Sequence, residues 1–166
     1  IGWPDVGTVD MGNASNLCGQ CHQPRRPAPE PDGNGNFTIT STHYGPHHGP
    51  QVTVLYGLGG YEFDGSLSYP ADGSAAHYKD VTCTGCHMYS DESTTDAGGH
   101  TFWPTEASCT VCHTNGIPDI EAEINGLLDQ LATMLQAEGV LDDDMHVVKG
   151  TYPVEQAGAF YNWIML

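Results

Sequence analysis

The sequence has little positive charge and no long hydrophobic run. Only 4 Lys and Arg stand against 21 Asp and Glu, so the formal net charge of the 166 residues is −17. So acidic a surface repels nucleic acid and anionic membranes, which excludes proteins that act by binding either. Because no apolar run approaches the roughly 20 residues that cross a bilayer, we expect no membrane-spanning segment.

The sequence also lacks the material for a conventional core. Aliphatic runs are short, while the chain contains 21 Gly and 11 Pro. This composition predicts a single domain that is mostly irregular, with a few short α-helices and minimal β-structure. Such a chain needs another apolar body around which to fold.

All six cysteines belong to one repeated motif, and none is left over. C-x-x-C-H occurs at residues 18–22, 83–87 and 109–113. This pattern is the attachment signature of a c-type haem, in which two thiols bond to the porphyrin and the histidine binds the iron. We therefore predict three covalent haems as the core. Their thioether ligands would be Cys18, Cys21, Cys83, Cys86, Cys109 and Cys112, and their first iron ligands His22, His87 and His113.

Zinc and disulfides are the alternatives. The second and third C-x-x-C pairs would also suit a zinc ribbon. Zinc does not require a histidine behind every second cysteine, however, and a third pair has no partner in a four-ligand site. Cysteines spaced C-x-x-C seldom connect distant segments as disulfides.

The expected address is outside the cytoplasm. Haem c is attached beyond the cytoplasmic membrane, and a chain that begins at Ile1 resembles a product whose signal peptide has been removed. We expect an extracellular or cell-surface protein, with the periplasm as the alternative. Asn13 and Asn36 lie in N-glycosylation sequons, which are common by chance.

The chain divides into an N-terminal arm (1–17), a haem-binding core (18–113), an amphipathic helix (118–139) and a C-terminal helix (154–166). The amphipathic helix is predicted by apolar residues that recur on one helical face, and this face should pack on haem edges or on the last segment. The face comprises Ile120, Ile124, Leu127, Leu128, Leu131, Met134 and Leu135.

Shorter elements are also predicted. Residues 37–40 alternate and suit a brief strand, residues 52–58 suit a helical turn or strand, and residues 32–36 read as a turn, not a calcium loop. In the C-terminal helix, four side chains should point inward: Ala157, Phe160, Tyr161 and Ile164.

The sixth iron ligand decides the chemistry. A second histidine gives a low-spin electron carrier, whereas an open position favours catalysis. The histidines that remain for three irons are His43, His47, His48, His77, His100 and His146. His77 and His100 precede haem motifs and are the preferred candidates, followed by His47 and His48. Methionines are weaker candidates: Met11, Met134 and Met145 stay open, whereas Met88 follows His87 directly and is not assigned.

Four sequence blocks resemble a family of multihaem c-type cytochromes. They are HHGPQ at 47–51, GGYE at 59–62, CHM at 86–88 and GGHTF at 98–102, and residues 157–163 resemble the last helix of such proteins. The family includes extracellular cytochromes that polymerise into conductive filaments. The resemblance implies that His47, His48, His77 and His100 are distal ligands of bis-histidine haems.

The leading interpretation is therefore electron transfer without substrate chemistry, as the subunit of a homopolymeric filament. Filament relatives usually carry four or more haems, and here four histidines compete for three irons, so the extra histidine could ligate a haem in a neighbouring copy. Redox proteins or extracellular acceptors would be the other partners. The alternatives are a discrete electron shuttle, whose acidic surface docks basic partners, and a multihaem reductase with one open iron.

Overall fold

The computed structural model describes residues 2–3, 7–47, 49–65, 68–92 and 94–166. Within these ranges the chain forms seven α-helices, one 3-10 turn and two small antiparallel sheets of two short strands each. The prediction of a largely irregular chain with short helices and little β-structure is confirmed.

The helices are, in chain order, α1 (Ser15–Cys21), α2 (Gln51–Tyr56), α3 (Ala76–Asp80), α4 (Thr82–His87), η1 (Gly99–Thr101), α5 (Glu106–Thr110), α6 (Glu121–Ala137) and α7 (Val154–Met165). The strands are β1 (Gly2–Trp3), β2 (Gly7–Thr8), β3 (Asn36–Ile39) and β4 (Gly150–Pro153). The predicted strand at 37–40 is thus β3, and the segment at 52–58 is helical as α2.

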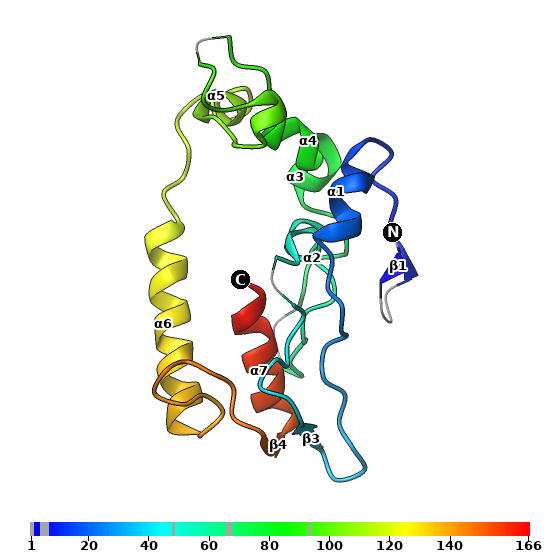
Figure 1. Ribbon diagram of the computed structural model, residues 1–166, viewed down its shortest axis with the longest axis vertical. Coiled ribbons are helices and arrows are strands. Elements are labelled where there is room, and N and C mark those ends of the chain that lie inside the picture. The colour runs from blue at the N-terminus through cyan, green and yellow to red at the C-terminus, as the bar shows by residue number, and fades with distance from the viewer. Residues whose placement is uncertain (1, 4–6, 48, 66–67, 93) are drawn as a thin grey trace.

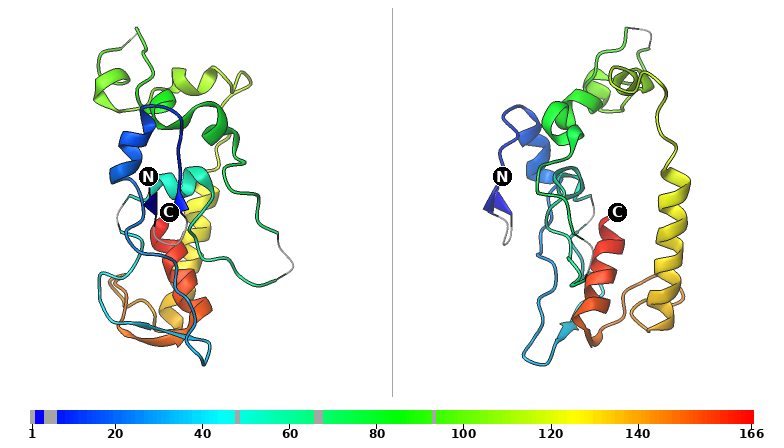
Figure 2. Two further views of the ribbon diagram at one scale, coloured as in Figure 1. Left: turned by 90° about the vertical axis from the view of Figure 1, so that its right-hand side faces the viewer. Right: turned by 180° about the vertical axis from the view of Figure 1, so that it is seen from behind.

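The four helices α1, α3, α4 and α5 gather at one end of the molecule (Figure 1). From there α6 descends along one side, and α7 returns beside it in the opposite direction (Figures 1 and 2). The β3–β4 pair closes the far end, with Phe37 opposite Tyr152 in the register. The sheet therefore ties the segment after the first haem motif to the C-terminal helix.

The larger apolar core lies where α6, α7 and β3 meet. Tyr161, Val140 and Ile39 are almost completely buried there. The Tyr161 hydroxyl donates to the Arg26 carbonyl oxygen at 2.7 Å, which anchors α7 to the proline-rich segment after the first motif. Of the side chains predicted to point inward from this helix, Ala157, Phe160 and Tyr161 do so. The prediction for Ile164 is wrong, because that side chain near the helix end is 38% exposed.

Only the lower half of the α6 apolar face is covered. Leu135 is buried against the core, whereas Ile120 and Leu127 in the upper half are 58% and 53% exposed. Met134 is 65% exposed and lies outside the buried stripe. The helix spans Glu121–Ala137 within the predicted range 118–139, and the positive φ of 71° at Gly139 suits a chain that has left the helix. The apolar face of α6 thus packs against the core at its C-terminal half, and its N-terminal half is exposed.

A second, smaller cluster lies beneath the N-terminal arm. Val9 and Met11 are buried with Val52 of α2. This part of the predicted N-terminal arm therefore packs against the body of the protein. Its burial places the first residues of α1 close to α2.

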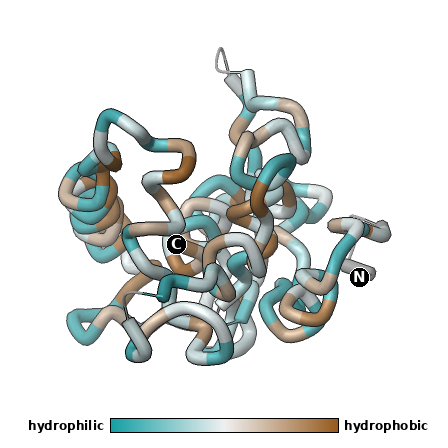
Figure 3. Tube along the Cα trace, turned by 90° about the horizontal axis from the view of Figure 1, so that it is seen from above, coloured by the Kyte–Doolittle hydropathy of each residue, from teal (hydrophilic) through white to brown (hydrophobic). Residues whose placement is uncertain are grey.

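The chain is open for its mass. It exposes 10,625 Å² for 17.8 kDa, whereas a compact monomer of this mass would expose about 8,000 Å². Hydrophobic residues are spread through the fold instead of gathering at one centre (Figure 3). Large side chains are more than half exposed near the motifs: Leu17 directly before the first, Trp103 between the second and the third, and Val111 within the third. An additional apolar body at the motifs would cover such side chains.

Candidate functional site

Each haem motif begins in one helical turn. Cys18 and Cys21 lie in α1, and the His22 amide donates to the Cys18 carbonyl oxygen at 3.0 Å. The third motif repeats this arrangement, since the His113 amide donates to the Cys109 carbonyl oxygen at 2.9 Å. The second motif lies within α4. Helical spacing of i, i+3 and i+4 brings both thiols and the histidine to one side of the turn.

The three motifs form a row along α1, α4 and α5 (Figure 1). Burial raises the pKa of Cys83, and the neighbouring thiol of Cys18 raises it further. Burial likewise raises the pKa of Cys86, with added contributions from Cys109 and Cys112. Helix α4 contacts both α1 and α5, so the second motif lies between the first and the third.

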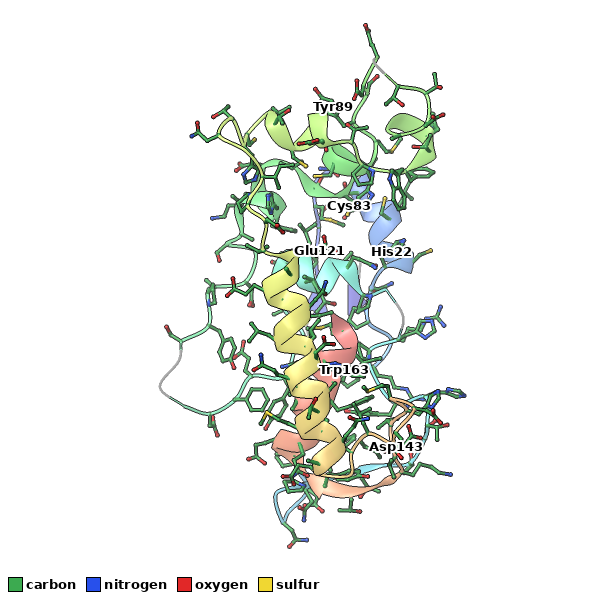
Figure 4. All side chains as sticks on the ribbon, turned by 90° about the vertical axis from the view of Figure 1, so that its left-hand side faces the viewer. His22, Cys83, Tyr89, Glu121, Asp143 and Trp163 are labelled. Carbon is green, nitrogen blue, oxygen red and sulfur yellow. The ribbon has the colours of Figure 1, made fainter. Side chains whose placement is uncertain are left out.

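A buried hydroxyl cluster fixes the first motif against the second. Ser15 is fully buried, and its Oγ lies 2.9 Å from Thr82 Oγ1 and 3.0 Å from Thr84 Oγ1. The Thr84 amide also donates to Ser15 Oγ at 3.0 Å. Asn13 Nδ2 donates to Thr82 Oγ1 at 3.1 Å, which helps to hold Thr82 at its unusual φ of 57°. Figure 4 labels His22 and Cys83, one from each motif, in the same region.

Replacing Ser15 by alanine should therefore loosen the contact between α1 and α4. The change removes a hydrogen-bond partner from the hydroxyls of Thr82 and Thr84 and from the Thr84 amide, away from solvent. We therefore expect the free energy of unfolding to fall by about 2 kcal/mol. Urea unfolding measures it. The matched control is Thr133→Ala, because the exposed Thr133 hydroxyl only returns to its own helix, and it should change stability by less than about 0.5 kcal/mol. Equal effects of the two variants would contradict the role of the cluster.

The His22 ring is oriented by a side-chain amide. Its Nδ1 lies 2.7 Å from Gln51 Oε1, and the Val52 amide donates to the His22 carbonyl oxygen at 3.0 Å. An amide oxygen only accepts, so Nδ1 of the neutral ring carries the proton and Nε2 carries the lone pair. Nε2 is then the atom available to a metal.

The His87 ring is oriented in the same sense by a peptide oxygen. Its Nδ1 lies 2.9 Å from the Phe102 carbonyl oxygen. Phe102 has a φ of 58°, and it follows the turn η1 that contains His100. Two motif histidines thus present Nε2 as the free nitrogen, although the two acceptors differ in kind.

The third motif histidine faces one of the predicted distal ligands. The rings of His77 and His113 have centroids 5.9 Å apart and are inclined by 45°. Two histidines that bind one iron from opposite sides would have ring centroids about 6 Å apart. This sum contains two iron–nitrogen bonds of about 2 Å and, in each ring, the distance from the ligating nitrogen to the centroid. The two histidines therefore have the spacing of opposite ligands on one iron. His77 is near the second motif in sequence but adjoins the third in space.

The remaining histidines have different surroundings. His47 lies in the segment between Pro46 and Gln51, both of which bond to the first motif region, while His48 lies outside the described residues. His100 is exposed in η1, with its ring 6.5 Å from that of Phe102. His43 is exposed after β3. His146 is also exposed, 3.7 Å from Asp142 at the end of the molecule that Asp143 marks in Figure 4.

The methionines left open as ligands lie in three different surroundings, and the cluster that contains Met11 also contacts Cys83 of the second motif. Met11 is buried in the small cluster under the N-terminal arm. Met134 is exposed on α6, and Met145 is 46% exposed in the loop before β4. Histidine stays the predicted distal ligand.

Within the residues that the structure describes, no three His, Cys, Asp or Glu side chains converge on a point that could hold a metal ion. Each of the six cysteines is a free thiol. Haem c does not need a preformed cluster of this kind, because the porphyrin supplies four of the six iron ligands and the protein supplies two. The paired thiols on one turn, the oriented histidines and the His77–His113 spacing fit haem c.

Comparison of the chain with protein-family models, with curated proteins and with solved structures gave no match. None of the described helices is both long enough and apolar enough to cross a bilayer.

Two parts of the site were not predicted from sequence. Gln51 belongs to the HHGPQ block, but its role as acceptor for His22 depends on a contact across 29 positions. The Ser15 cluster joins residues 67 and 69 positions apart. The sequence offered a reason to consider Gln51, because it lies in the same block as the candidate ligands His47 and His48. It offered no such reason for Ser15, which is the third residue of the Asn13 sequon.

Proposed function

We propose that this protein is a trihaem c-type cytochrome that transfers electrons through bis-histidine haems. The observation that carries the proposal is the pairing of His77 with His113 at the third motif. It provides two nitrogen ligands at the spacing that one iron requires, which leaves no open position there for a substrate. Bound haem c would supply a one-electron iron centre at each motif.

The protein's own residues would position the three groups. The cysteine pairs of the three motifs would hold the porphyrins in a row, and the Ser15 cluster would keep the first two motifs from moving apart. Gln51 and Phe102 would keep His22 and His87 turned with Nε2 toward the metal. Rigid, six-coordinate ligation limits reorganisation when the iron changes oxidation state, which suits electron transfer.

His100 is proposed as a ligand for an iron other than that of His87. The Phe102 oxygen lies on the Nδ1 side of His87, away from Nε2. A histidine that bound the same iron from the opposite side would have its main chain well beyond Nε2, far from that oxygen. His100 precedes Phe102 by two residues, which span at most about 7 Å. His100 would therefore serve another haem, in this chain or in a neighbouring copy.

The haem content and spin state test this function. The protein matured with its haems should contain three covalent haems per chain and show a low-spin bis-histidine spectrum in both oxidation states. A zinc protein without haem, or a spectrum dominated by high-spin iron, would contradict the proposal. The second result would favour the multihaem reductase.

We further propose an extracellular filament as the assembled form. Exposed apolar side chains beside the motifs, among them Leu17, Trp103 and Val111, offer surface to another copy. His100 offers a ligand. The net charge of −17 favours the competing function, a discrete shuttle that docks basic proteins.

Salt separates the two assemblies. Identical subunits of charge −17 repel one another, so added salt should promote filaments, whereas it should weaken the docking of a shuttle to a basic partner. Electron microscopy of the haem-loaded protein at low and high salt measures this. Monodisperse particles under both conditions would reject the filament and leave the shuttle.

A further inference from the structure

Pro46, Gln51 and Val52 are bonded to the first motif or to Arg25 just behind it, at three points in all. The Arg25 amide donates to the Pro46 carbonyl oxygen at 2.9 Å, and the Val52 amide donates to the His22 carbonyl oxygen at 3.0 Å. The third point is the bond from His22 Nδ1 to Gln51 Oε1 at 2.7 Å. Because the first two points are main-chain bonds, Pro46 and Val52 would stay docked if the Gln51 side chain were changed.

The position of the Gln51 side-chain amide is not fixed by burial. Gln51 is exposed at the start of α2. A side chain at position 49 would place its Cβ 3.0 Å from Gln51 Oε1, and Gly49 has a φ of 76°. Glycine thus leaves room for the amide, whose described polar contact is with His22. This geometry points to a function that acts through the His22 ring.

We propose that Gln51 is a positioning residue that orients His22 and sets the reduction potential of the first haem. The inference rests on the proposed function. A bond from Nδ1–H to an acceptor makes the imidazole a stronger donor at Nε2, which favours the oxidised iron and lowers the potential. The acceptor of His87 is the Phe102 main-chain oxygen, which no side-chain substitution removes. Of these two haems, the first is therefore the one whose potential a single side chain would tune.

Two substitutions of Gln51 separate this role from a structural one. Gln51→Leu removes the acceptor at similar volume, and Gln51→Glu keeps an acceptor and strengthens it. The potential of one haem should rise in the first variant and fall in the second. We expect a change of up to about tenfold in the ratio of oxidised to reduced iron, which is about 59 mV for one electron. A merely structural role would move the potential in one direction for both variants.

The experiment is a spectroelectrochemical titration of the haem-loaded protein and its variants at neutral pH. Gln130→Leu is the matched control, because Gln130 is an exposed glutamine in α6, outside all three motifs, and it should leave all three potentials unchanged. Opposite shifts of a single potential, with low-spin spectra retained, would support the inference. Unchanged potentials in Gln51→Leu, or shifts of the same sign in both variants, would overturn the inference about Gln51. The proposed function would still stand in that case if the unaltered protein held three low-spin haems. Absence of haem from the unaltered protein would overturn both.

Discussion

Replacement of His77 by alanine is expected to convert one of the three haems from low-spin to high-spin. The ring of His77 stands 5.9 Å from that of His113, so under the proposed function its loss would remove one of the two histidine ligands of the third haem. The low-spin absorption should fall by about one third relative to the unaltered protein, in which three motifs are present. Electron paramagnetic resonance and visible absorption of the oxidised protein measure the change.

A second substitution at the same position tests ligation directly. His77→Met keeps a ligand of another kind, so the haem should stay low-spin while its potential rises, as methionine–histidine ligation does in cytochromes c. The control is His146→Ala, which alters an exposed histidine whose described contacts are with Asp142. Three low-spin haems in His77→Ala would show that another residue supplies this ligand.

Replacement of Gly98 by alanine is expected to cost about 3 kcal/mol of stability, from a left-handed backbone and a steric overlap. Gly98 has a φ of 78°, and an added Cβ would overlap the main-chain oxygen of Tyr89, which cannot rotate away. The Gly98 amide also donates to the Trp103 carbonyl oxygen at 2.6 Å. The substitution would thus displace the loop that supplies the Phe102 oxygen to His87.

Gly99 provides the control for the overlap. It also has a positive φ, 52°, but no atom lies within 4 Å of the place that its Cβ would take. Gly99→Ala should therefore cost about 1 kcal/mol, the backbone contribution alone. Chemical denaturation followed by circular dichroism measures both variants. Equal losses would mean that the contact with Tyr89 relaxes without cost.

The GGYE block and the last helix were recognised separately in the sequence, and they contact each other in the fold. The Tyr61 amide donates to Asn162 Oδ1 at 2.7 Å, and Asn162 Nδ2 donates back to the Tyr61 oxygen at 2.8 Å. Gly158, one turn earlier, lies against the Tyr61 ring and has no room for a Cβ. Spacing along the chain predicts neither contact, because 101 positions separate Tyr61 from Asn162.

The α6 face illustrates the limit of pattern reading. Its periodicity predicts a helix correctly, since backbone hydrogen bonds and spacing of 3.6 residues are local properties. What covers the face is not local. Leu135 meets the core, while Ile120 and Leu127 on the same helix are exposed. Periodicity alone indicates that a face is apolar and does not identify its partner.

The sequence by itself determined the haem-attachment prediction, the short helices and the scarcity of β-structure. Two cysteines and a histidine on one turn are chemistry within five consecutive residues, so no tertiary contact is needed to recognise them. Only the tertiary structure decided that His77 faces His113, that Gln51 holds His22 and that Ser15 joins α1 to α4. These contacts form between segments that are far apart in the sequence. The same local pattern is compatible with many ways of bringing such segments together, so the pattern does not predict the contacts.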